Sequence, residues 1–277
     1  MLSMPSRRRF VQGLAAGGVV AGLGGWQRGA QAATPVGGMP TLSGTEFTLS
    51  VGETLVNYTG VTRPAVTVNG SLPAPLLRWK QGSTVTLQVR NDLPRGSIHG
   101  PDTSIHWHGI LLPANMDGVP GMSFDGIRPG ERYLYRFQLK QSGTYWYHSH
   151  SGFQEQGGMY GPLVIDPIEP PPYAFDREHV LMLSDWTDMN PADLFARLKK
   201  MSAHDNHYQR TLGDFLHDAR RQGLQATLAD RGSWGRMRMT PTDLSDVNAQ
   251  TYTYLLNGTT SLGNWTGLFK PGETLML

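Results

Sequence analysis

The sequence contains no cysteine among its 277 residues. A chain without cysteine forms no disulfide bonds, so its stability must come from a hydrophobic core and from backbone pairing. With 39% hydrophobic and 17% charged residues, it has enough apolar side chains to build such a core. Length and composition therefore predict a globular protein of one or two domains.

The sequence also lacks a marked excess of either charge, since its formal net charge is only +2. Four arginines, Arg7, Arg8, Arg9 and Arg28, lie in the first 32 residues, which contain no acidic residue. Without that segment the formal charge changes from +2 to −2. A balance this close to neutral gives no indication of a nucleic-acid partner.

A long hydrophobic run is missing as well. The apolar segment Val11–Gly25 is short and rich in glycine, whereas a membrane span needs about 20 predominantly apolar residues. We therefore expect no stable membrane insertion, and a weak anchor is the less favoured alternative. Consecutive arginines precede this segment and a small-residue stretch, Ala30–Ala33, follows it, which is typical of a cleaved export signal.

The motif "SRRRFVQ" at residues 6–12 resembles a twin-arginine export signal, whose transporter carries folded proteins. This resemblance implies a signal peptide over residues 1–32 and the twin-arginine (Tat) export machinery as a partner. It also implies a periplasmic location, with metal loaded before export.

Alternation of polar and apolar residues dominates the sequence after residue 45. Five such segments are predicted to be short strands: Glu46–Val51, Pro64–Gly70, Ser83–Asn91, Arg132–Leu139 and Gly161–Pro167. In the third of them, Val85, Leu87 and Val89 should face the core. Many short strands separated by turns predict an all-β Greek-key sandwich or barrel over residues 45–168.

A proline-rich segment, Asp166–Asp176, is predicted to separate this domain from a second one over residues 176–277. The second domain should begin with a strand at Glu178–Trp186 and return to strand structure at Gln250–Gly258.

Between those strands we expect a helical insertion at about residues 190–223. Asn190 can cap a first helix that starts with Pro191. Its apolar stripe comprises Leu194, Phe195 and Leu198. A second helix, ending near Gly223, is predicted from the spacing of Leu212, Phe215, Leu216 and Ala219.

An internal repeat connects the two domains. "VNG" at residues 68–70 is followed by "KQGSTVTLQV" at 80–89, and "LNG" at 256–258 is followed by "KPGETLML" at 270–277. The second domain is thus predicted to be the beginning of another copy of the first, within a longer protein. Chance similarity between two β-rich segments is the alternative.

Two His-x-His pairs, His106/His108 and His148/His150, are the strongest functional signal. Side chains at positions i and i+2 of a strand point to the same face. Each pair can therefore present two imidazoles, while Trp107 points into the core. One pair is often packed or solvated without any ligand role, but two pairs in one domain predict a metal site for copper, zinc, iron or nickel.

The other histidines carry a weaker signal. His99 lies in a turn and His179 begins a strand, and the remaining three are on or near the helical insertion: His204, His207 and His217. The i, i+3 spacing of His204 and His207 could bind a metal, but a solvated helix face is the favoured interpretation. Met237 and Met239 could offer thioethers to Cu(I), although such methionines more often pack.

Around "HWHG" and "HSHSG" the sequence resembles the multicopper oxidases, and in particular their copper-resistance branch. The similarity runs through Ile105–Pro167, continues in the segments 198–215 and 227–247, and covers essentially all of the chain after the leader. It implies a cupredoxin-like β-sandwich for the first domain and the beginning of a second one.

By this resemblance, His106 binds the type 2 copper and His108 a type 3 copper, and His148 and His150 both bind type 3 copper. The family takes electrons from a reducing substrate at a cysteine-ligated type 1 copper and reduces O2 to water at a trinuclear cluster. This chain has no cysteine and holds half of the expected cluster ligands.

The resemblance therefore implies the N-terminal part of a periplasmic oxidase of copper resistance, which oxidises Cu(I) or organic reductants. We expect the 277 residues alone to be inactive. A copper-binding or sequestering protein without turnover is the competing hypothesis. A zinc hydrolase is a third, for which we expect no glutamate beside either pair, although Asp102 and Asp117 are near in sequence.

Overall fold

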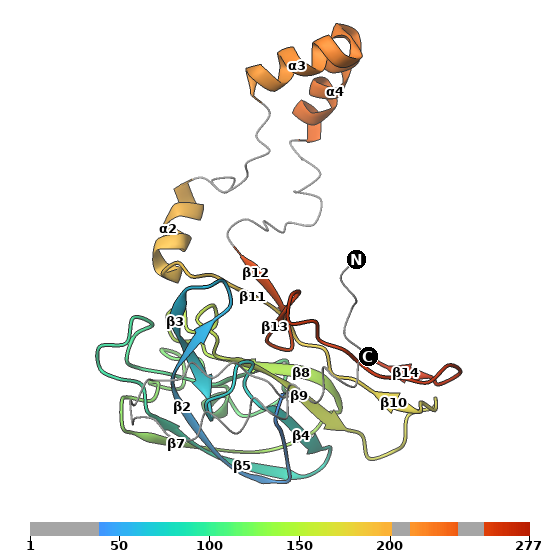
Figure 1. Ribbon diagram of the computed structural model, residues 1–277. Coiled ribbons are helices and arrows are strands. Elements are labelled where there is room, and N and C mark those ends of the chain that lie inside the picture. The colour runs from blue at the N-terminus through green and yellow to red at the C-terminus, as the bar shows by residue number, and fades with distance from the viewer. Residues whose placement is uncertain (1–38, 201–210, 238–251) are drawn as a thin grey trace, which may run out of the picture. The chain divides into compact units, whose positions relative to one another are not determined.

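The computed structural model of the chain describes residues 39–200, 211–237 and 252–277 (Figure 1). The predicted signal peptide, His204, His207 and Met239 lie outside these ranges. Among the helices in this part of the chain, none is long and apolar enough to cross a membrane.

Two sheets pack around one core to form a β-sandwich. The first sheet has the strand order β3 (Thr62–Val68), β2 (Glu46–Asn57), β5 (Thr84–Asn91), β7 (Arg132–Gln138). The second has the order β1 (Thr41–Ser43), β4 (Leu76–Lys80), β9 (Tyr160–Asp166), β8 (Gly143–His148), β6 (His106–His108). The five strands predicted from alternation are all present, and the predicted all-β fold is confirmed.

Strand β5 shows why these residues form a sandwich. Its Val85, Leu87 and Val89 side chains are fully buried, as predicted, while the residues between them are more exposed. Burial of each such side chain contributes about 1.5–3 kcal/mol. Aromatic side chains fill the middle of the core, where the rings of Trp79 and Trp107 lie 5.6 Å apart.

Strands β1 and β4 were not predicted from the sequence. β4 pairs in parallel with both β1 and β9 and lies inside its sheet. Three of its five residues, Leu76, Leu77 and Trp79, are buried. Polar and apolar residues alternate only over Leu77–Lys80, and four residues are at the lower limit for predicting a strand.

The second part of the chain has short strands and helices. The strands are β10 (Arg177–Glu178), β11 (Leu183–Trp186), β12 (Thr253–Leu256), β13 (Thr259–Thr260) and β14 (Leu275–Met276). The predicted strand 178–186 is therefore divided in two. β11, β12 and β13 form one sheet, and β10 pairs with β14.

The predicted helices are present as α2 (Pro191–Lys200) and α3 (Leu212–Gln222), and a 3-10 turn, η1 (Ala114–Met116), lies in the sandwich domain. Asn190 caps α2 by accepting a hydrogen bond from the amide of Ala192, and Gly223 caps the C-terminus of α3. Helical structure then continues in α4 (Leu224–Met237), beyond the predicted end near residue 223. The α4 sequence has no apolar stripe at helical spacing, which explains why it was missed.

The internal repeat is present in the hydrogen bonding. In the first copy, Asn69 and Ser50 exchange two hydrogen bonds, from Asn69 N to Ser50 O (2.8 Å) and from Ser50 N to Asn69 Oδ1 (2.8 Å). Asn257 and Met182 exchange the same two, at 2.8 and 2.7 Å. Both asparagines have positive φ, 52° and 50°, a conformation that asparagine tolerates better than most residues.

Strand register repeats as well. In the first copy, β2 and β5 pair in parallel with Glu46 opposite Thr86. In the second, β10 and β14 pair in parallel with Glu178 opposite Met276. Glu46 and Glu178 each precede the asparagine-bonded residue, Ser50 or Met182, by four positions, and Thr86 and Met276 each follow Gly82 or Gly272 by four. The second part therefore repeats the pairing of the first strands of the sandwich and carries a helical insertion.

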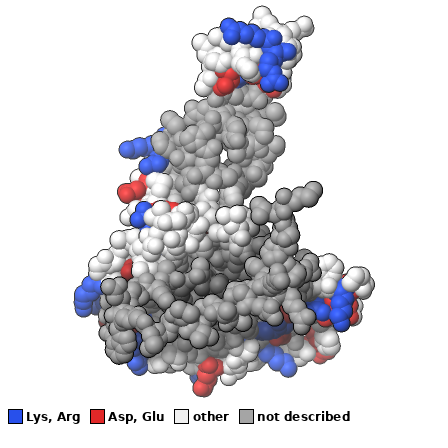
Figure 2. Space-filling view, in the orientation of Figure 1, with Lys and Arg blue, Asp and Glu red and all other residues white. Residues whose placement is uncertain are grey.

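The described surface carries both signs of charge. On the face drawn in Figure 2, basic and acidic side chains are scattered in small groups. This distribution agrees with the nearly neutral composition of the chain.

Candidate metal centre

The pairing of β6 with β8 brings the two His-x-His pairs together. These strands are antiparallel neighbours, and His106 lies directly opposite His148. Trp107, between the first two histidines, is fully buried in the core. The alternation predicted from sequence is therefore present, with Trp107 on the core face and both histidines of its pair on the other.

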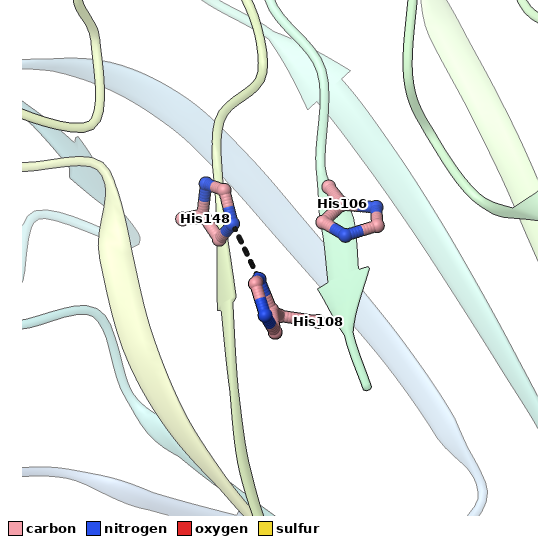
Figure 3. A group of neighbouring side chains, drawn as sticks. All are labelled: His106, His108 and His148. Atoms are coloured by element: carbon pink, nitrogen blue, oxygen red, sulfur yellow. Dashed lines mark hydrogen bonds between the residues drawn. The ribbon is translucent and has the colours of Figure 1, made fainter. Parts of the chain in front are cut away.

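Three of the four histidines form a compact cluster at the ends of these strands (Figure 3). His106, His108 and His148 each offer a ring nitrogen, and these atoms lie within 4.8 Å of one another. His148 is buried, with 5% of its surface exposed, whereas His108 is exposed. In the part of the chain that the structure describes, this is the one group of three such side chains with metal-ligand spacing.

The closest contact in the cluster joins His108 Nδ1 and His148 Nε2, which are 3.3 Å apart. Two nitrogens bound at about 2.0 Å to one tetrahedral metal ion would stand about 3.3 Å apart. The two rings are thus already spaced as ligands of a single ion.

In two of the rings, the nitrogen outside the cluster, called the outer nitrogen below, is hydrogen-bonded to a backbone carbonyl. His106 Nδ1 donates to Asp117 O (2.9 Å), and His148 Nδ1 donates to Ser149 O (2.9 Å). A carbonyl oxygen can only accept, so Nδ1 carries the proton in both rings and Nε2 keeps its lone pair. Such outer hydrogen bonds fix the tautomer and the orientation of metal-binding histidines.

Two carboxylates lie beside the same outer nitrogens. Glu155 Oε2 is 2.9 Å from His148 Nδ1, and Asp117 Oδ2 is 3.5 Å from His106 Nδ1. The expectation that no glutamate lies beside either pair was therefore wrong, because the loop after His150 folds Glu155 back. Asp117 is near the site as its sequence position suggested, whereas Asp102 contributes its backbone carbonyl to Gln154.

Electrostatics in the cluster favour neutral imidazole. Partial loss of solvent around the ring lowers the pKa of His108, although the residue as a whole is exposed, and the neighbouring His148 and His106 lower it further. The hydrogen bond from His148 lowers the pKa of Glu155, whose carboxylate is thereby kept ionised. Metal ions bind the neutral form of histidine, so the lowered pKa of His108 favours a ligand role, although the charges of Glu155 and Asp117 act in the opposite direction on that pKa.

Trp146 covers one side of the cluster. Its ring stacks on His148, with 4.1 Å between ring centroids, and lies 5.1 Å from His108. The aromatic ring restricts rotation of both imidazoles.

His150, the fourth predicted ligand, lies at the edge of the cluster. It follows the end of β8 by two residues and is exposed. Its ring centroid is 5.6 Å from that of His106 and 6.0 Å from that of His148. The structure therefore places His150 beside the group of three without bringing its nitrogens within the same 4.8 Å limit.

Three other histidines lie apart from this cluster. His99 Nε2 bonds to Pro64 O at 3.1 Å, and His179 Nε2 bonds to Leu268 O at 3.2 Å. His217 lies on α3. None of these three belongs to the group formed by His106, His108 and His148.

Glu155 is the residue of the site that sequence reasoning missed. It lies in a glycine-rich loop, "SGFQEQGG" at residues 151–158, which has no strand or helix periodicity. Without periodicity, the sequence carries no signal that directs its side chain to His148.

The donor set fits a borderline metal ion, because imidazole nitrogens suit copper, zinc, iron and nickel. The sandwich holds this cluster at the ends of two adjacent strands, β6 and β8. Residues 50–170 match the family described as "Multicopper oxidase". The match covers most of the sandwich, including both histidine pairs.

Similar proteins extend the match over the whole chain. It is 57% identical over 277 residues to the "Copper resistance protein A homolog" of Pseudomonas syringae pv. tomato, covering 100% of this chain and 46% of that protein. It is 55% identical to the "Copper resistance protein A" of Escherichia coli, covering 100% and 45%. The chain thus spans less than half the length of these curated relatives.

A solved structure shows the same fold. The crystal structure of the laccase from Botrytis aclada aligns with a TM-score of 0.50 and 36% identity, over 57% of this chain and 29% of that one. The predicted cupredoxin-like sandwich is confirmed by this agreement.

Proposed function

We propose that this chain is the copper-binding N-terminal part of an oxidase for copper resistance. In this proposal, His106, His108, His148 and His150 supply half of the histidine ligands of a trinuclear copper cluster. His106 binds type 2 copper, and the other three bind type 3 copper. The 3.3 Å separation of His108 Nδ1 and His148 Nε2 is the observation that carries the proposal.

Copper at this position would supply the one-electron chemistry that links oxidation of Cu(I) or an organic reductant to reduction of O2 to water. The residues of this chain would hold and orient the ions. The carbonyls of Asp117 and Ser149 keep the proton on Nδ1 of His106 and His148. Trp146 shields one face of His148 from water.

The carboxylate of Glu155 adds a negative charge beside His148. A carboxylate on the outer nitrogen of a ligand histidine raises the basicity of the other nitrogen and strengthens metal binding. Glu155 already contacts His148 Nδ1 and would not serve as the base of a zinc hydrolase in that position, which favours the copper proposal.

A copper-binding protein without turnover is the second candidate. It is favoured by the absence of cysteine from the sequence, because a type 1 copper site requires a thiolate. We propose accordingly that the 277 residues alone bind copper but do not catalyse oxidation. Further, we propose that the first 32 residues direct the chain through the twin-arginine pathway to the periplasm.

Metal analysis combined with oxygen uptake tests these proposals. The chain should bind copper in preference to zinc when expressed in the periplasm, and should consume no oxygen with a phenol or Cu(I). His148→Ala should lose bound copper, whereas His179→Ala, on the second part of the chain, should keep it. Zinc as the bound metal would contradict the copper proposal, and copper-dependent oxidation of the phenol would contradict inactivity.

A further inference from the structure

Gln154 is a fully buried polar side chain in the loop that follows the second histidine pair. The loop residues 151–158 form a series of turns between β8 and β9. A buried amide destabilises the fold if its hydrogen-bonding groups find no partner. Burial of Gln154 therefore requires hydrogen-bond partners for its amide oxygen and nitrogen.

The amide group of Gln154 has a partner for every donor and acceptor. Oε1 accepts hydrogen bonds from Thr103 Oγ1 (2.8 Å) and Ser149 Oγ (2.8 Å). Nε2 points to three carbonyl oxygens: Asp102 O (2.8 Å), His99 O (3.3 Å) and Gly100 O (3.3 Å). Because carbonyls only accept, this network determines which amide atom is nitrogen.

These partners belong to the two segments that carry the histidine pairs. Ser149 stands between His148 and His150. Thr103 stands three residues before His106, in the segment that leads into β6. Gln154 thus connects Ser149, which lies within the second histidine pair, to Thr103, which lies just before the strand that carries the first histidine pair.

A second link runs beside the first one. The hydroxyl oxygen of Ser104 accepts a hydrogen bond from the backbone amide of His150 at 2.9 Å and another from Ser151 Oγ at 3.0 Å. Both the Gln154 and Ser104 links are at the ends of β6 and β8, where the ladder between these strands stops at His106 and His148. Beyond the ladder, side-chain hydrogen bonds hold the two segments together.

We propose that Gln154 is a positioning residue that sets the register of one histidine pair against the other, an inference that rests on the proposed copper site. Its buried amide acts as a rigid bracket, because Oε1 accepts from both segments, at Thr103 and Ser149. Nε2 is held at the same time by three carbonyls of the segment that precedes Thr103. Loss of the bracket would let Ser149 and the Thr103 segment move apart, and the nitrogens of the two pairs would no longer converge on one ion.

Variants on the two sides of the bracket separate this role from a general effect on stability. Gln154→Met keeps the length of the side chain and removes its hydrogen bonds. Thr103→Val removes one bond to Oε1 at a residue outside both pairs, and Ser149→Ala removes the other. Thr67→Val is the matched control, since Thr67 is a buried threonine in β3 whose hydroxyl also makes hydrogen bonds.

The test measures Cu(II) affinity and the electron paramagnetic resonance spectrum of the full chain, together with unfolding of each variant without metal. We expect Gln154→Met to bind copper about tenfold or more weakly, within the range for lost outer contacts of a metal site. Thr103→Val and Ser149→Ala should each weaken binding and alter the copper spectrum. Thr67→Val should lower stability and leave affinity and spectrum unchanged.

The bracket hypothesis is contradicted if Thr103→Val matches Thr67→Val in copper affinity and spectrum. This outcome is decisive even if Gln154→Met fails to fold, because Thr103→Val changes a single methyl-sized group. Failure of the wild-type chain to bind copper would instead overturn the proposed metal site, and the bracket role with it.

Discussion

Gly118 shows how a single backbone position constrains the candidate metal centre. Its φ is +77°, and a Cβ atom there would stand 1.8 Å from Ile105 O. Ile105 directly precedes His106, and the residue before Gly118 is Asp117, whose carbonyl holds His106 Nδ1. Only glycine allows the two segments around His106 to approach this closely.

We therefore predict that Gly118→Ala destabilises the chain more than Gly121→Ala. Gly121 also has a positive φ of +83°, but a Cβ there meets no atom within 4 Å. Gly121→Ala should lose about 1–2 kcal/mol from the left-handed backbone conformation alone. Urea unfolding of both variants measures the difference, and equal losses would show that the segment opposite Gly118 can move away freely.

Glu155 gives a second prediction about single residues. Glu155→Ala removes the carboxylate at His148 Nδ1, and it should weaken copper binding by about tenfold. Glu155→Gln keeps an acceptor oxygen but loses the charge, so its effect should be smaller. Copper titration measures both, with Glu131→Gln as a control in another loop. Wild-type affinity in Glu155→Ala would rule out a role for this carboxylate in holding His148.

At the residue scale, the positions of side chains in strands could be predicted from the sequence, whereas those of side chains in loops could not. His106 and His108 could be placed on one face because strand periodicity is two. Gln154 and Glu155 could not be placed, because they lie in a loop whose course depends on contacts with residues about 50 positions earlier, such as Asp102.

At the scale of elements, the start of α3 is stabilised by a capping box. Thr211 Oγ1 accepts a hydrogen bond from the amide of Asp214, and the Asp214 carboxylate accepts one from the amide of Thr211. These bonds satisfy amides that have no partner within the helix. The first turn of α3 thus depends on two side chains.

Thr211→Ala should therefore open the first turn of α3. We expect amide hydrogen exchange of Asp214 and Phe215 to become about fivefold faster, while Thr211→Ser, which keeps the hydroxyl, should stay close to the wild type. Unchanged exchange in Thr211→Ala would show that the cap does not hold this turn.

The same cap should respond to pH. Hydrogen bonds from Thr211, first from its side chain and then from its backbone amide, lower the pKa of Asp214 below its ordinary value. A group whose pKa is lower in the folded state stabilises that state above its unfolded pKa. Protection of the first turn should thus be complete near neutral pH and disappear as the pH falls through the folded pKa. Asp214→Asn should remove this pH dependence.

Elements with a clear period were predictable, and those without one were not. α2 and α3 followed from an apolar stripe and from the caps at Asn190 and Gly223. α4 has no such stripe, and β4 alternates over only four residues, so neither produces a periodic pattern long enough to interpret from the sequence.

At the scale of the whole molecule, the sandwich and the second repeat share a small apolar cluster. Trp186 and Leu255 from the second part pack with Val56, Ala65 and Leu72 of the sandwich. Arg78 adds a polar link, since its guanidinium bonds to Asp166 at 2.6 Å and to Glu178 at 2.7 Å. The two parts are therefore expected to unfold together.

Trp186→Ala tests that coupling. Trp186 is 3% exposed, and its truncation should cost about 3–5 kcal/mol. Tyr173→Ala, at a residue that is 56% exposed, should cost little. Tryptophan fluorescence and far-ultraviolet circular dichroism should report one common urea transition in the wild type. Two separated transitions in the wild type would contradict the coupling.

The repeat was also predictable at this scale, because "VNG" and "LNG" carry the same asparagine turn. Ser50 and Asn69 are 19 positions apart, whereas Met182 and Asn257 are 75 positions apart. The 56 additional residues of the second copy did not hide the repeat, because the turn motif itself is unchanged. What the sequence could not show is the packing of the two copies, which depends on side chains far apart in the chain.

Anomalous diffraction at the copper edge from crystals of the copper-loaded chain tests the central claim most directly. We predict a copper peak bonded to both His108 Nδ1 and His148 Nε2, the two atoms that stand 3.3 Å apart. A peak bonded to neither of these nitrogens, with copper held instead at His179 or His217, would contradict it.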